Sequence, residues 1–136
     1  MLKKYLQPVA LSNQVSLAVL ILRVGFAVLM LPHGYAKMQE FLRGSHDFPD
    51  PLQVSPMVSQ SLTIFAELLC SILLLLGLFT RPAALILAFC MFVVAFVIHW
   101  NEPLGEKEHG LLYFIGYVVV LLTGAGKYSL DAKVFK

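Results

Sequence analysis

The segment Ser61–Trp100, SLTIFAELLCSILLLLGLFTRPAALILAFCMFVVAFVIHW, decides the fold. It consists of two apolar runs joined by Arg81-Pro82, and its other formal charge is Glu67, inside the first run. A helical membrane span needs roughly 20 mostly apolar residues, which each run supplies. Because proline fits the first turn of a helix, Pro82 predicts a tight turn between two antiparallel spans.

Two further apolar stretches, around 15–38 and 110–126, extend this pattern. Of the 136 residues, 59% are hydrophobic and 13% are charged, whereas soluble domains carry about 25% charged residues. We therefore predict an all-α integral membrane protein with a single domain over residues 1–136, folded as a four-helix transmembrane bundle. The expected helices cover about 14–40, 60–80, 82–100 and 109–126, with an irregular, proline-containing loop at 43–58.

A signal peptide is the competing interpretation of the first stretch, because Lys3 and Lys4 precede it. However, Arg23 interrupts its apolar run and no small-residue cleavage pattern follows, so we expect the first helix to be retained. The excess of Lys and Arg near helix ends favours both termini in the cytoplasm. The basic residues on the side of the termini are Lys3, Lys4, Arg81, Lys127, Lys133 and Lys136, and those on the other side are Lys37, Arg43 and Lys107.

Arg23 and Glu67 are each the only charge within an apolar run. A charge at the centre of a span costs about 2.5–3.5 kcal/mol, so each needs a partner. At a rise of 1.5 Å per residue, Glu67 comes between the levels of Arg23 and His33, roughly 7–8 Å from each. Two pairings are therefore open: Glu67 with Arg23, or Glu67 with His33 or Lys37. Such a pair acts either as a structural clasp or as part of a polar pocket around Arg23 and Glu67 that faces the outer side.

Other polar groups leave alternatives open. His99, at the end of the third helix, is either a hydrogen-bonding group or an interfacial anchor. Tyr113 and Tyr117 share one face of the fourth helix, where they pack the bundle or form a wall for a planar ligand such as a quinone. The histidines have no metal-binding spacing on any one helix, so no metal is expected. Cys70 and Cys90 fit small buried hydrophobic positions.

Several short motifs resemble the DoxX family of small bacterial membrane proteins. In chain order they are Arg23 with Pro32–Lys37, Glu67 with Leu73–Ala84, His99, Glu108 with Leu111–Tyr113, and Gly124–Asp131. Cys70 and Ser71 depart from the pattern, because the family often has glycines there. The resemblance implies a multi-pass protein of the bacterial inner membrane that is associated with redox processes, some of which involve quinones.

Together, the polar residues and the resemblance lead to a functional hypothesis: a redox-linked membrane component that interacts with a quinone or another small molecule. The candidate catalytic residues are Glu67 and His33, and the candidate ligand-binding residues are Arg23, Lys37, His99 and Tyr113. The alternative is a non-catalytic anchor or assembly subunit for a partner oxidoreductase. A homo-oligomer is also open, whereas the net charge of +2 does not indicate nucleic acid.

Overall fold

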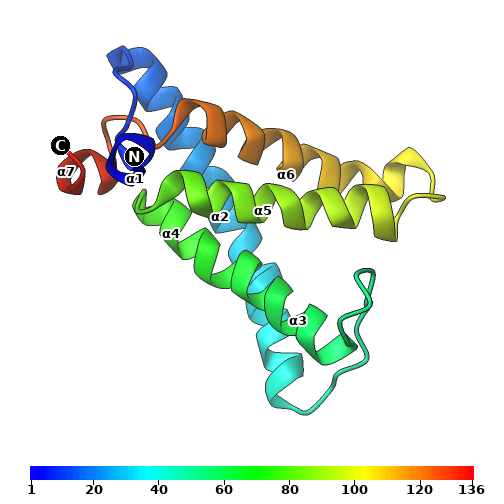
Figure 1. Ribbon diagram of the computed structural model, residues 1–136. Helices are drawn as coiled ribbons and strands as arrows, with labels where there is room; N and C mark the ends of the chain where they lie inside the picture. Colours follow the sequence, from blue (N-terminus) through cyan, green and yellow to red (C-terminus); the bar gives the residue numbers. More distant parts are fainter.

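A computed structural model describes residues 1–136, and it is helical throughout its ordered elements, with no strands (Figure 1). Two π-helical segments, η1 and η2, continue neighbouring α-helices without a break. The elements are α1 (Leu2–Leu6), α2 (Asn13–Leu42), α3 (Pro56–Ile64), η1 (Phe65–Cys70), α4 (Ser71–Leu76), α5 (Thr80–Val93), η2 (Val94–Ile98), α6 (Leu104–Thr123) and α7 (Asp131–Val134).

Three continuous helices are long and apolar enough to cross a membrane. They are Asn13–Leu42, Pro56–Leu76 and Thr80–Ile98. The fourth long helix, α6, carries Glu106, Lys107 and Glu108 near its start and packs along α5. The prediction of an all-α membrane protein is therefore confirmed, with three helices that meet the length and composition of a span and α6 beside them. The placement of both termini in the cytoplasm stays a prediction.

The long helices form two arms that meet at one end of the molecule (Figure 1). One arm consists of α2 and the continuous α3–η1–α4 helix, and the other consists of α5–η2 and α6. Both chain termini lie at the end where the arms meet. At the opposite end α3 diverges from α5–η2, and the segment between α2 and α3 runs there as an extended loop. The candidate site residues predicted from the sequence do not all lie at one of these ends.

The helix starts follow local capping chemistry. Ser12 caps α2, where its side chain accepts a hydrogen bond from Val15 N at 3.2 Å. The second long helix begins at Pro56, earlier than the expected residue 60, because Ser55 accepts from Val58 N and Pro56 occupies the first turn. Proline lacks an amide hydrogen, which the first helical turn does not need, so Pro56 opens this helix and does not belong to the preceding loop.

The remaining boundaries also differ in detail from the expected ones. Gly77 ends α4 with φ +68°, so the second long helix stops before the expected residue 80. The charged residues before position 109 form the first turns of α6, which begins at Leu104 and ends at Thr123. The third long helix covers Thr80–Ile98, against the expected 82–100. Short helices α1 and α7 occupy the terminal segments.

The core lies between the two arms, and several of the side chains that α5 contributes to it are small. Ala83, Ala84 and Ala88 are buried there, and small residues allow helices to approach closely. Gly34 makes a similar contact on α2, because a Cβ atom at this position would lie 2.7 Å from the backbone C of Glu67 and the backbone N of Leu68. The backbones of α2 and η1 therefore touch at Gly34, which places α2 directly beside Glu67.

Candidate functional site

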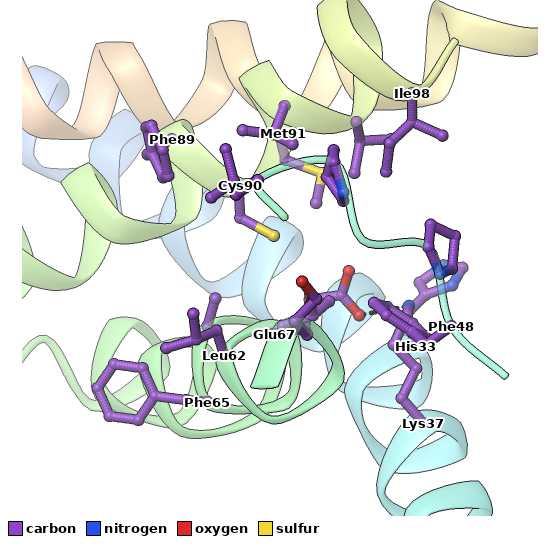
Figure 2. Close-up of a pocket in the computed structure, with 18 of the residues that line it drawn as sticks. His33, Lys37, Phe48, Leu62, Phe65, Glu67, Phe89, Cys90, Met91 and Ile98 are labelled. Atoms are coloured by element: carbon purple, nitrogen blue, oxygen red, sulfur yellow. Dashed lines mark hydrogen bonds and ion pairs between the residues drawn. The ribbon is translucent and has the colours of Figure 1, made fainter. Parts of the chain in front are cut away.

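A cavity of about 570 Å³ lies between the diverging ends of the two arms (Figure 2). The α3–η1 helix forms one wall and α5–η2 the other. The loop before α3 contributes Phe48, Pro49, Pro51 and Leu52 to the lining. More than half of the lining residues are hydrophobic, 12 of 21, so the few polar side chains among them stand out as groups that could orient a ligand.

The central polar feature is an ion pair between Lys37 on α2 and Glu67 on η1. Lys37 Nζ donates to Glu67 Oε2 at 2.6 Å. The Glu67 side chain is 4% exposed and that of Lys37 is 26% exposed, so the carboxylate is the more deeply buried partner. Of the two pairings left open by the sequence, the structure contains the one between Glu67 and Lys37. The close approach at Gly34, one helical turn before Lys37, brings the ammonium within reach of the carboxylate.

Both walls change from α-helical to π-helical geometry beside the cavity. Glu67 lies within η1, together with the lining residues Phe65 and Ala66. On the facing wall, η2 contributes Val94 and Ile98. In a π-helix the amide bonds to the carbonyl five residues back, as His99 N does to Val94 O at 3.1 Å. Such segments are rare and occur frequently at functional sites. Glu67, within η1, and His99, directly after η2, both line the cavity.

Three histidines line the cavity. His33 from α2 and His109 from α6 have ring centroids 4.9 Å apart, and both side chains are exposed. His99 Nδ1 lies 2.7 Å from Glu102 Oε2, and its side chain also lines the cavity. The structure therefore brings together His33, Lys37, Glu67 and His99 from the sequence-based candidates. Sequence reasoning did not select His109, although its place at the start of the fourth helix, next to Glu108, was a usable signal.

Arg23 lies apart from this cavity. Its Nη1 donates to Leu74 O at 2.8 Å and to Leu75 O at 3.1 Å, and its Nη2 donates to Tyr128 O at 2.7 Å. The last carbonyl groups of a helix lack intrahelical partners and carry partial negative charge, so the end of α4 suits a guanidinium group. Arg23 is 1% exposed and binds the C-terminal segment to α4. The Arg23–Glu67 pair considered from the sequence is not formed.

Tyr113 stands behind the cavity wall and is not part of its lining. Its ring lies 4.8 Å from that of His109 and 5.2 Å from that of Phe26, centroid to centroid. Tyr113 is buried, so it supports His109 from inside the bundle. Cys90 does line the cavity, whereas Cys70 is buried in the core, and both thiols are free.

The loop over the cavity is tied to α3 by polar contacts. Asp50 accepts hydrogen bonds from Ser59 Oγ at 2.7 Å, Ser55 N at 2.9 Å and Val54 N at 3.0 Å. The hydrogen bond from Ser59 is the main reason why the pKa of Asp50 is lowered from its ordinary value. The buried Gln60 makes a second attachment, because its Nε2 donates to Ser45 O and its Oε1 lies 2.9 Å from His46 Nδ1.

These features define a small helical membrane protein with a partly apolar cavity and a buried ion pair at one end of the bundle. The DoxX family matches residues 18–100, and the chain belongs to this family. The matched region contains Lys37, Glu67 and His99 and ends before α6, which supplies His109.

Two proteins of Haemophilus influenzae, each described as an uncharacterized protein, are similar to this chain. The first is 35% identical over 126 residues, which cover 85% of this chain and 89% of the relative. The second is 30% identical over 94 residues, which cover 65% of this chain and 62% of the relative. No solved structure matches the chain.

Proposed function

We propose that this protein binds a quinone, or a small redox-active molecule of similar chemistry, in the cavity beside the Lys37–Glu67 pair. The observation that carries the proposal is the composition of the cavity: a mostly apolar lining that also contains an ion pair and three histidines, His33, His99 and His109. Ligand sites commonly have this character, with apolar walls and a small number of placed polar groups.

The residues that line the cavity match the chemistry of a quinone. A quinone ring is planar and apolar on its faces, and its two carbonyl oxygens accept hydrogen bonds. Phe48 and Ile98 provide apolar contact area, and the Lys37 ammonium and the imidazole N–H groups are suitable donors. When bound, a quinone supplies two-electron, two-proton chemistry.

In this proposal Glu67 handles protons at Oε2, and Lys37 stabilises its carboxylate form between proton transfers. His33 is exposed and lines the cavity, so its ring nitrogens can pass protons between water and the cavity. Tyr113 acts indirectly, through its contact with the His109 ring. We place Arg23 outside the ligand site, as the group that holds the end of α4.

Lys37, Glu67 and the histidines can move protons but do not carry electrons. We therefore propose that a partner oxidoreductase exchanges electrons with the bound ligand in the bacterial inner membrane. The anchor hypothesis differs in one respect, because a pure anchor would hold the same partner without using Glu67. Comparing partner recovery and ligand binding in one Glu67 variant separates these two functions.

A titration tests ligand binding directly. The protein in lipid nanodiscs is titrated with decylubiquinone, bound quinone is quantified after separation, and empty nanodiscs give the lipid background. We expect saturable binding to the wild type and a loss of about tenfold in affinity, or about 1.4 kcal/mol, for Glu67→Gln. Glu106→Gln, on the exposed first turn of α6, is the matched control and should bind as the wild type does. Equal affinity of Glu67→Gln and the wild type contradicts the proposed role of Glu67.

A further inference from the structure

The cavity changes in polarity from one end to the other. Figure 2 shows Leu62, Phe65 and Phe89 at one end, His33 and Lys37 with Phe48 at the other, and Glu67 between them, paired with Lys37. A ligand that fills this cavity therefore meets hydrocarbon side chains along one part of its length and charged or hydrogen-bonding groups along the rest. This gradient matches an amphiphile, which has a polar head and an apolar tail.

The apolar end lies at the surface of the bundle. Leu62, Phe65 and Phe89 are 53%, 44% and 57% exposed, although all three belong to the cavity lining. Phe89 precedes the end of η2 at Ile98 by a distance of roughly 14 Å along the helix axis, at 1.5 Å per residue. The hydrocarbon core of a bilayer is about 30 Å thick, so this surface faces acyl chains near the middle of the membrane.

The other end of the cavity faces water through different groups. The loop before α3 covers it with Phe48 and Pro51, and the attachments of Asp50 and Gln60 hold this loop on α3. His33 and His109 form an exposed edge beside the loop. Water can exchange protons with these two imidazole side chains. A hydrophobic ligand makes no favourable apolar contact by entering past them.

We propose that the ligand is a membrane-dissolved amphiphile that enters laterally from the bilayer, between Leu62 and Phe65 on one side and Phe89 on the other. Its oxygen-bearing head lies at the Lys37–Glu67 pair and its tail remains among the lipid acyl chains. The identity of the head as a quinone rests on the proposed function, and the lateral route does not. The volume of about 570 Å³ holds a head and the first part of a tail, so a long tail must extend outside.

Tail length provides the equilibrium test. Decylubiquinone and a ubiquinone with a long polyisoprenoid tail are titrated into the nanodiscs. Each dissociation constant is expressed as a concentration of quinone in the lipid phase. We expect equal lipid-phase affinities, because the added tail stays in the same environment on binding. An enclosed site would reject the long tail, so weakening by about tenfold or more overturns the proposal. If neither quinone binds, the proposed function fails.

Association rates test the route itself. Leu62→Trp narrows the proposed opening, and Leu76→Trp is the matched control on the exposed face of α4, outside the cavity lining. We expect Leu62→Trp to slow association several-fold and Leu76→Trp to leave it unchanged. Asp50→Asn, which weakens the loop attachment, should also leave the rate unchanged. Faster association with Asp50→Asn, together with no effect of Leu62→Trp, shows entry from the aqueous side and overturns the lateral route.

Lipid extracts of the purified protein distinguish the sources of the amphiphile. An isoprenoid quinone recovered in proportion to the protein, and reduced in amount by Leu62→Trp, supports both proposals. If a fatty acid or phospholipid is recovered in proportion to the protein and decylubiquinone does not displace it, the result supports the lateral route and overturns the quinone proposal. Recovery of neither, combined with binding of a water-soluble sulfonated quinone at the same site, overturns the lateral route.

Discussion

Replacing Lys37 with methionine is expected to destabilise the protein by about 3–5 kcal/mol, because the change leaves the Glu67 carboxylate buried without its partner. Glu67 is 4% exposed and Lys37 is its only salt-bridge partner, at 2.6 Å. In the Glu67→Gln background the same replacement should cost much less, since no buried charge is left behind. The double variant Lys37→Met/Glu67→Gln is therefore expected to be more stable than Lys37→Met alone.

A double-mutant cycle on unfolding in a mild detergent measures this coupling. Lys133→Met, at an exposed position in α7, is the control for removal of a lysine and should have little effect. Additive effects of the two single replacements at Lys37 and Glu67 would mean that the carboxylate does not depend on Lys37. That outcome would remove the reason for treating these two residues as one functional unit.

Replacing Arg23 with leucine should destabilise the protein by about 3 kcal/mol or more, because hydrogen bonds to charged groups contribute about 1.5–3 kcal/mol each. Three such bonds are lost, to the carbonyl oxygens of Leu74, Leu75 and Tyr128. Arg23→Lys keeps the charge but lacks the planar fork that reaches two helix-end carbonyls and the C-terminal segment together, so it should recover only part of the stability.

The Arg23 variants also separate structure from ligand binding. Folded Arg23→Lys protein is expected to bind decylubiquinone with wild-type affinity, because Arg23 does not line the cavity. Thermal unfolding and the nanodisc titration, performed on the same preparation, check both statements. If Arg23→Lys unfolds at the same temperature as the wild type but no longer binds quinone, the result would contradict this assignment. Arg23 would then belong to the ligand site.

The fold followed from local and compositional signals in the sequence. Apolar runs of sufficient length predict spans, because backbone groups in hydrocarbon must be satisfied within the helix. Pro82 is located correctly in the first turn of the third long helix, since this preference of proline depends only on adjacent residues. Pro56 shows where this reasoning is ambiguous: a proline close to others suggests a loop, yet the same residue preceded by a capping serine begins a helix.

The site was harder to predict because helix crossing and rotation are not local properties. The rise per residue places Arg23 and His33 at similar distances from Glu67 in depth and Lys37 further away, but it does not give the direction in which each side chain leaves α2. The contact of Gly34 with η1 decides in favour of Lys37. The π-helical geometry of η1 was also beyond prediction, since the apolar pattern around Glu67 is the same whether the amides bond four or five residues back.

Photoaffinity mapping in native membranes tests the central claim most directly. A quinone with a photoreactive group on its ring is activated in membranes that contain the protein, and labelled peptides are identified by mass spectrometry with and without excess decylubiquinone. The proposed site predicts competed labelling on Leu62–Glu67 and Phe89–Val94, with less labelling in Glu67→Gln. Labelling confined to the outward face of α4, or labelling that decylubiquinone does not reduce, would contradict a quinone site in this cavity.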